Sequence, residues 1–336
     1  MAAAPISHRP RGAILRAGKT DRPADAPPAA SAAILRDMQI AFLGFGLIGG
    51  SIARAVRANP ETKDWTMSAW SPSGEGPRKA AADLVIDVAG AKAEAILRDA
   101  DLIVLAGPAT SCLPLIDRLA GKWRTMIRPD AIVTDVASTK KAIVERADAA
   151  GLWFVGGHPM AGREEVGYEA SDADLFVDRP WVVVPGALAG ESDIERVTEL
   201  AVACRANVLR MEAAVHDRAV AAISHLPLLV SAALVEAVAI RPGDAKSRAA
   251  ARAEWPVAAG LAAGGWRDMS RLALGDPAMG AAIAVTNATE IGARLRDLRG
   301  VLDAWQAELD RPDGPDEKGA TARLTAAKTV LKKSTK

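Results

Sequence analysis

The chain has 336 residues, of which 50% are hydrophobic and 25% are charged, and its formal net charge is +1. This length and apolar content allow a large core in one or two domains, and the balanced charge argues against a nucleic-acid partner. Cys112 and Cys204 lie far apart without metal or redox spacing, and we find no secretory signal. We therefore expect no metal site, no structural disulfide and a cytoplasmic location.

Residues 1–37 are rich in Ala, Pro and Arg and show no sustained hydrophobic period, which predicts a disordered leader. Its arginines would also suit a transit peptide, although Asp21 and Asp25 weaken that interpretation. In a further alternative, Met38 is the true or ancestral start of the protein.

Residues 38–57 form the most informative stretch of the chain: a short apolar strand, a G-x-G-x-x-G turn and the start of a helix follow one another. Gly44 permits the tight turn, Gly46 lets backbone N–H groups approach a phosphate, and Gly49 allows close packing of helix on strand. The alternative is a glycine-rich turn in an ordinary α/β protein. We assign pyrophosphate binding to Gly44, Gly46, Leu47, Ile48 and Gly49.

A second strand, predicted at 65–70, ends about 20 residues beyond the glycine turn, where NAD sites usually carry an acidic residue. Ser71 occupies that position. The following segment, 72–79, is predicted as a loop with hydroxyls and cations that would suit a 2′-phosphate, so the pattern leans towards NADP over NAD. Glu75 is the alternative partner for ribose hydroxyls. The candidate residues are Ser71, Ser73 and Arg78.

Strands and helices continue to alternate through residue 212, which predicts an α/β fold with a doubly wound, mostly parallel sheet of the Rossmann kind. The further strands are predicted at 83–87, 101–106, 131–136, 152–157, 181–185 and 207–211, with a helix at 91–98.

Residues 213–310 show long alanine-rich helical runs and no convincing strand, which predicts an all-α second domain. Such helices exceed the needs of a small bundle, so we expect a homodimer formed through this domain. The apolar run 221–240 contains Ser, His, Pro and Glu and is interpreted as a buried helix, with no membrane partner. The polar tail, 311–336, is expected to be disordered.

His158 is the first candidate for chemistry, because it follows a predicted strand in a Gly-Gly-His-Pro-Met-Ala-Gly loop. Open α/β sheets place ligand-contacting groups at such positions. An imidazole beside a nicotinamide could accept a proton as hydride leaves a substrate. The alternative is a surface or capping histidine.

The run from His158 to Glu164 resembles the prephenate and arogenate dehydrogenase family of tyrosine biosynthesis. The resemblance extends in order from Met38 to about Leu309. It includes Gly44–Ser51, Asp135–Lys140, His216-Asp217, Ser224–Pro227 and Trp266–Arg271.

This resemblance implies oxidative decarboxylation of a small-molecule cyclohexadienol, in which NAD(P) takes a hydride and carbon dioxide leaves. Prephenate would yield 4-hydroxyphenylpyruvate, and arogenate would yield tyrosine. His158 would accept the hydroxyl proton, and Ser138 would bind near the hydroxyl and orient the histidine. Arg271 would bind a substrate carboxylate, and His225 would line the same cleft. The structural alternatives are a helix cap for Ser138, a surface ion pair for Arg271 and an ordinary helix histidine for His225.

Two positions depart from the family pattern. Leu228 stands where many members have a second histidine after Ser-His-Leu-Pro, and Gly280 stands where several carry a tryptophan. The choice between prephenate and arogenate therefore stays open, as does an amino-substituted analogue. No further regulatory domain is expected after Leu309, so feedback by tyrosine would act at the active site.

Two other functions compete with this one. A β-hydroxyacid dehydrogenase would also join a Rossmann domain to helices, but it needs a catalytic lysine in the second domain. Lys246, the only lysine between Lys141 and Lys318, lies in a polar turn. A non-catalytic NAD(P)-binding protein would need neither His158 nor Arg271.

Overall fold

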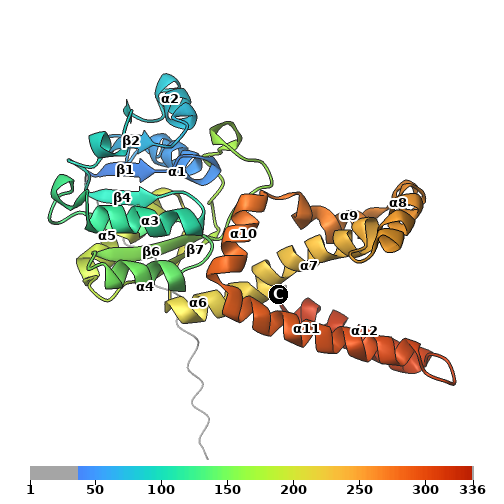
Figure 1. Ribbon diagram of the computed structural model, residues 1–336. Coiled ribbons are helices and arrows are strands. Elements are labelled where there is room, and N and C mark those ends of the chain that lie inside the picture. The colour runs from blue at the N-terminus through green and yellow to red at the C-terminus, as the bar shows by residue number, and fades with distance from the viewer. Residues whose placement is uncertain (1–36, 335–336) are drawn as a thin grey trace, which may run out of the picture. The chain divides into compact units, whose positions relative to one another are not determined.

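An eight-stranded sheet organises the first part of the chain (Figure 1), in a computed structural model that describes residues 37–334. The order is β3-β2-β1-β4-β5-β6-β7-β8, and every neighbouring pair is parallel except β6 and β7. The predicted leader lies outside the described residues apart from its last position. The strands are β1 (Gln39–Leu43), β2 (Thr66–Trp70), β3 (Val88–Ala89), β4 (Leu102–Leu105), β5 (Ile132–Asp135), β6 (Phe154–Pro159), β7 (Pro180–Pro185) and β8 (Asn207–Arg210).

Helices cover both faces of this sheet, as the alternating sequence pattern predicts. Alternate side chains of β1 point to opposite layers, with Ile40 and Phe42 in one core and Ala41 and Leu43 in the other. The first core is closed by α1 (Leu47–Ala58), α2 (Glu75–Ala82) and α5 (Glu191–Ala203), and the second by α3 (Ala109–Ala120) and α4 (Lys141–Ala149). The Rossmann prediction is confirmed.

The segment around α2 differs from the prediction. Residues expected as a loop form α2, which begins after Gly74 in the left-handed region with φ of 65°. The strand expected at 83–87 is a turn through Leu84, whose φ of 59° is incompatible with a strand, and β3 follows at 88–89. The helix expected at 91–98 is the short 3-10 turn η1 (Ala93–Ile96). Further 3-10 turns are η2 (Arg124–Met126) and η3 (Tyr168–Ala170).

The second part of the chain is helical, and no strand follows β8 among residues 211–334. One continuous run contains two π-helical turns, which are regions with i→i+5 hydrogen bonds. It consists of α6 (Ala213–Val220), π-turn η4 (Ala221–His225), α7 (Leu226–Val235) and π-turn η5 (Glu236–Ile240). There follow α8 (Ala245–Gly260), α9 (Gly264–Ser270), 3-10 turn η6 (Arg271–Leu274), α10 (Pro277–Thr286), α11 (Ala288–Leu309) and α12 (Glu317–Ser334).

Helix α12 corrects the prediction of a disordered tail. It lies beside α11 (Figure 1), and the Arg323 guanidinium stacks over the Trp305 ring at 3.9 Å from its centroid. Arg323 also donates to the Ala304 carbonyl at 3.2 Å. The segment is polar but rich in Ala, Lys and Leu, which favour helix, so its polarity marks an exposed helix instead of disorder.

The apolar run 221–240 does not fulfil the expectation of a buried helix, and in the structure it belongs to a longer helical run, 213–240. The length and composition of the helical run 213–240 would allow it to span a membrane. Only 11% of its most apolar window is buried within the chain. Ile223, for example, is 71% exposed. The helical part buries a cluster of just three apolar residues among those described, Ala221, Ile283 and Ile291. Too little of this chain packs against the run to cover it.

Candidate active site

The glycine turn after β1 has the geometry that a pyrophosphate requires. Gly44 has φ of 93°, and a Cβ there would lie 2.8 Å from the Ala106 carbonyl oxygen. A Cβ on Gly46 would meet nothing within 4 Å, so the backbone of this residue is open to an approaching ligand. A Cβ on Gly49 would lie 3.2 Å from Cβ of Ala106, which reflects tight packing of helix on strand.

The start of α1 presents free backbone donors beside Gly46. The helix begins at Leu47, and neither a side-chain cap nor an acidic residue occupies its first turn. The N–H groups of Leu47, Ile48 and Gly49 therefore have no intrahelical acceptor, and together with the helix dipole they favour an anion. The residues present fit a dinucleotide pyrophosphate.

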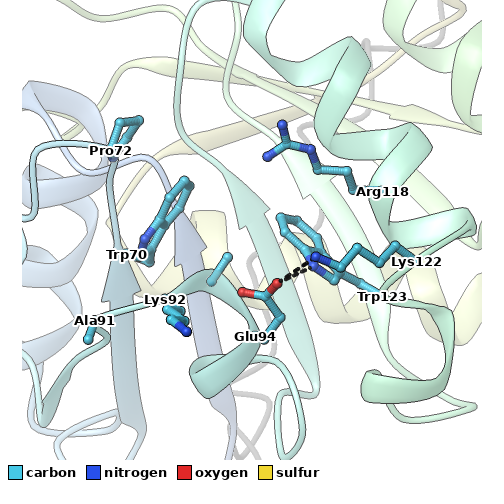
Figure 2. Close-up of a pocket in the computed structure, with 9 residues that line it drawn as sticks. Trp70, Pro72, Ala91, Lys92, Glu94, Arg118, Lys122 and Trp123 are labelled. Carbon is cyan, nitrogen blue, oxygen red and sulfur yellow. Dashed lines mark hydrogen bonds and ion pairs between the residues drawn. The ribbon is translucent and has the colours of Figure 1, made fainter.

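A cavity of about 500 Å³ opens where β2 ends. Figure 2 shows Trp70 on one side and Arg118, Lys122 and Trp123 on the other. Glu94 Oε1 accepts from Trp123 Nε1 at 2.9 Å and pairs with Lys122 at 3.5 Å, so its charge is partly neutralised. The cavity thus combines flat aromatic surface with a surplus of positive charge, because Lys92 also lines it.

The three residues proposed for the ribose end of the cofactor stabilise the start of α2. Ser71 Oγ accepts from the Gly74 N–H at 3.2 Å, and Ser73 Oγ accepts from the Glu75 N–H at 3.3 Å. Arg78 Nε donates to the Gly74 carbonyl at 3.1 Å. Sequence reasoning missed Lys92 and Arg118, because they reach this cavity from η1 and α3 and nothing in the local pattern places them there.

His158 lies within β6, not in the loop that the sequence predicts. It pairs with Val182 of β7, and the antiparallel partner extends the strand to Pro159. The residue is 7% exposed. Burial, followed by the nearby His216, Lys140 and His225, holds the pKa of His158 well below its usual value, so the imidazole is neutral at physiological pH.

His158 is joined to the helical part by a short series of hydrogen bonds. Its Nδ1 lies 2.8 Å from Nε2 of His216, and Nδ1 of His216 lies 2.7 Å from Oδ1 of Asp217. Asp217 also accepts from the N–H groups of Lys140 at 2.7 Å and Lys141 at 3.0 Å. Although burial raises the pKa of Asp217, these hydrogen bonds outweigh it and the pKa is lowered, so the carboxylate stays ionised.

A buried ion pair fixes the backbone on both sides of Ser138. Lys140 Nζ pairs with Asp135 and also donates to the Gly157 carbonyl at 2.6 Å, immediately before His158. Asp135 Oδ2 accepts from the Ala137 N–H at 3.0 Å. The loop that carries Ser138 is therefore held against β6, although no hydrogen bond joins the Ser138 hydroxyl to His158 among the described residues.

His225 reaches the same region from the π-turn η4. Its Nδ1 accepts from Asn287 Nδ2 at 3.1 Å, and the second amide hydrogen of Asn287 goes to the Asp217 carbonyl at 2.8 Å. Nε2 of His225 is buried and has no hydrogen-bond partner in the described part of the chain. Burial lowers the pKa of His225 to about 4, and the Ser138 backbone lies close enough to oppose that shift.

The π-turn explains why His225 and Asp217 share a helix face. They are eight residues apart, which would be about 2.2 turns of a regular α-helix. A π-turn takes up one additional residue, so eight residues span close to two turns and bring His225 above Asp217. The sequence contains the Ser-His-Leu-Pro run but gives no local signal of this turn.

Arg271 lies in η6 and forms an ion pair with Glu164. Its side chain is 59% exposed. Glu164 comes six residues after His158, so the ion pair holds the loop after β6 against the helical part. The exposed guanidinium of Arg271 is open to solvent and can contact a ligand. Its partner Glu164 is a carboxylate that the sequence analysis did not assign.

Comparison with known proteins accounts for both parts of the chain. Residues 52–210 match the model of the prephenate dehydrogenase nucleotide-binding domain, and residues 212–317 match that of the prephenate dehydrogenase dimerization domain. The chain belongs to the prephenate dehydrogenase family. Membership confirms the resemblance drawn from the sequence, and it identifies the protein as an oxidoreductase that uses a nicotinamide dinucleotide.

Individual relatives within the prephenate dehydrogenase family are moderately similar. Prephenate dehydrogenase of Bacillus subtilis is 31% identical over 81% of this chain and 68% of its own. Cyclohexadienyl dehydrogenase of Zymomonas mobilis is 28% identical over 81% of this chain and 86% of its own. The crystal structure of Synechocystis arogenate dehydrogenase is 31% identical with a TM-score of 0.70, and it covers 88% of this chain and 100% of its own.

The two departures from the prephenate dehydrogenase pattern are neighbours in space. A Cβ on Gly280 of α10 would lie 3.6 Å from Cδ2 of Leu228 in α7. The apolar residue and the small residue therefore lie at one place, one helical turn beyond His225.

Proposed function

We propose that this protein catalyses the oxidative decarboxylation of prephenate, arogenate or both, within tyrosine biosynthesis. The observation that carries the proposal is His158: a buried, neutral imidazole with one nitrogen hydrogen-bonded and the other free, in a chain of the prephenate dehydrogenase family. A nicotinamide held near the glycine turn would accept the hydride from the ring carbon that bears the hydroxyl.

His158 acts as the base in this proposal. Its Nε2 takes the hydroxyl proton as hydride leaves the same carbon, and a carbonyl forms. The bond from the ring to its carboxylate then breaks, carbon dioxide leaves, and the electron pair aromatises the ring. The phenolate oxygen takes the proton back from His158, so the base is regenerated and no net proton is consumed.

The remaining residues bind and orient the substrate. His225, whose Nε2 is buried without a hydrogen-bond partner among the described residues, lies in the same region as the half-buried Ser138 hydroxyl. Arg271 can exchange its ion pair with Glu164 for a bidentate bond to a substrate carboxylate. The apolar contact of Leu228 with Gly280 lies beyond His225, and it supports a substrate side chain recognised more by shape than by charge.

The preferred cofactor in this proposal is NADP. Ser71 leaves the end of β2 without the carboxylate that would repel a 2′-phosphate, and Lys92 and Arg118 add positive charge to the adjoining cavity. The test is the KM for NADP and for NAD in the wild type and in Arg118→Ala. We expect a lower KM for NADP, raised about tenfold by the substitution, with little change for NAD. A lower KM for NAD in the wild type would reject this preference.

A second copy of the chain is the proposed partner, bound through the helical part to form a homodimer. The match to a dimerization domain and the uncovered apolar run 213–240 support it. His216, Asp217 and His225 lie on that same run and serve the site, which counts against a membrane role. We propose no nucleic-acid partner and a cytoplasmic location.

The direct test uses the purified protein with prephenate or arogenate and with NAD or NADP, in four combinations. Absorbance of the reduced nicotinamide reports turnover, and we expect it in at least one combination. No turnover in all four would redirect the proposal to an amino-substituted cyclohexadienol, with Leu228 and Gly280 as the first positions to vary. The β-hydroxyacid alternative finds no support, since Lys246 is exposed in the first turn of α8.

A further inference from the structure

We propose that His216 and Asp217 are positioning residues that fix the tautomer of His158, so that its Nε2 is the nitrogen that accepts the proton. This inference rests on the proposed function for its consequence in catalysis. Its structural content, the protonation pattern of three linked side chains, can be measured without turnover.

The direction of each hydrogen bond follows from the ionised end. Asp217 is a carboxylate and can only accept, so Nδ1 of His216 must carry a hydrogen and donate to it over 2.7 Å. With that hydrogen on Nδ1, the neutral form of His216 carries its lone pair on Nε2. That atom lies 2.8 Å from Nδ1 of His158, which must therefore donate, and the remaining lone pair of His158 is left on Nε2.

Nothing in the described residues competes for that lone pair. Nε2 of His158 has no hydrogen-bond partner among them, and this atom is not fully buried. The free nitrogen is thus accessible to a ligand. In the opposite tautomer the same atom would carry a hydrogen and could not act as a base.

The anchoring of Asp217 makes the arrangement rigid. Oδ1 accepts from the Lys140 N–H and Oδ2 from the Lys141 N–H, so the carboxylate cannot rotate without losing two backbone hydrogen bonds. His216 and Asp217 are each 1% exposed, and the two imidazole rings meet edge to face at 75° with centroids 5.0 Å apart. Water is therefore excluded from the links that set the tautomer.

The other charged groups around His158 do not disturb this pattern. Lys140 is neutralised by Asp135 and points to the Gly157 carbonyl. His225 is bonded to Asn287 through Nδ1 and makes no hydrogen bond to His158 in the described part of the chain. The only described side-chain hydrogen bond of His158 is the one that its Nδ1 donates to His216 in the helical part of the chain.

The decisive variant is Asp217→Asn. Oδ1 of Asp217 accepts from both His216 and the Lys140 N–H, so an asparagine nitrogen at that place donates to Nδ1 of His216 and leaves the Lys140 N–H without its acceptor. In that orientation both histidines exchange tautomers, so that Nε2 of His158 carries the hydrogen. We expect kcat to fall by about 10²- to 10⁴-fold with little change in the KM for the cofactor.

The tautomer itself is read by ¹⁵N NMR of the imidazole nitrogens in the full-length protein. The chain has four histidines, so substitution of each in turn assigns the signals. We expect His158 to carry its hydrogen on Nδ1 in the wild type and on Nε2 in Asp217→Asn. A purely structural role for Asp217 would lower stability without exchanging these two signals.

A matched pair at His216 separates hydrogen bonding from packing. In His216→Gln the side-chain oxygen can accept from Nδ1 of His158, whereas in His216→Leu nothing can. We expect the Gln variant to retain at least tenfold more kcat than the Leu variant at equal unfolding free energy.

Two results would overturn the inference: a wild-type His158 with its hydrogen on Nε2, or an Asp217→Asn variant in which the hydrogen moves to Nε2 while kcat is unchanged. If Asp217→Asn does not fold, the wild-type spectrum alone decides. If the wild type turns over none of the four substrate and cofactor pairs, the proposed function fails while the spectrum still tests the tautomer.

Discussion

The two parts of this chain stabilise themselves in different ways. Residues 38–212 enclose two large apolar cores, one on each face of the sheet, with the largest side chains such as Phe42 and Trp181 fully buried. The described residues of the helical part form a cluster of only three buried apolar side chains and leave long apolar helices uncovered. The first part thus contains its own apolar cores, whereas the second leaves much apolar surface uncovered.

Buried polar groups, in contrast, come from both parts. The sheet contributes His158, Asp135 and Lys140, and the helical part contributes His216, Asp217, His225 and Asn287, all of them buried where the two parts meet. Stability is therefore concentrated in the sheet and chemistry at the junction. Each prediction below tests one side of this contrast.

The strongest test concerns the base, which the sheet provides. His158→Asn should lower kcat by 10²-fold or more, because no other described group can take the hydroxyl proton from that position, while cofactor affinity stays nearly constant. Steady-state kinetics and a cofactor titration measure the two quantities separately. An unchanged kcat would remove His158 from the mechanism.

The next test concerns substrate binding, which the helical part provides. Arg271→Ala should raise the KM for the substrate by about 10- to 100-fold with a smaller effect on kcat, because a carboxylate partner is lost. Arg271→Lys is the matched control: it keeps the charge but cannot form the bidentate bond, so KM should still rise. An effect confined to kcat would show that Arg271 acts elsewhere.

The uncovered apolar surface gives a test of assembly. Ile223→Glu combined with Ile240→Glu places charges on exposed positions of the apolar run 213–240 and should weaken subunit association by tenfold or more, as measured by light scattering over a range of protein concentrations. Val202→Glu, at an exposed apolar position on α5 of the sheet part, is the control and should leave association unchanged. Equal effects of both would contradict the assignment of the interface.

The smallest expected effect is on stability. His158 and His225 have pKa values below the ordinary value of about 6.5 that they regain on unfolding, so the unfolded chain binds more protons between the two values. Unfolding free energy should therefore decrease as the pH falls below about 6.5, by up to about 1.4 kcal/mol per pH unit for each histidine.

Urea unfolding at several pH values between 7 and 5 measures this slope. His225→Asn should remove one contribution and give a shallower dependence than the wild type. Identical slopes in the two proteins would show that burial of His225 is not linked to folding.

The sequence predicted the features that depend on local pattern. The glycine turn, the alternation of strands and helices and the helical second part all follow from short-range periodicity, and the structure has each of them. His158 was identified but misplaced in a loop, because the strand there is extended by pairing with β7, and a pairing between distant segments leaves no local mark.

The partners within the site were beyond sequence reasoning for the same reason. His216 and Asp217 were seen only as part of a family resemblance, since their roles depend on contacts with β6 and with the N–H groups after Thr139. The sequence predicts Ser71 and Arg78 as cofactor ligands but gives no sign of their hydrogen bonds in the turn before α2. The polar composition of the tail predicts disorder, but the same residues include good helix formers and form α12.

The π-turn η4 sets stability against activity. Removing one residue from it, for instance Ala222, would allow a regular helix with standard i→i+4 hydrogen bonds from α6 into α7, and the backbone would gain by the change. The same deletion would rotate His225 and everything after it by about 100° relative to His216 and Asp217. We therefore expect this deletion to raise stability and to lower activity, so that one residue in the π-turn exchanges helix stability for the position of His225.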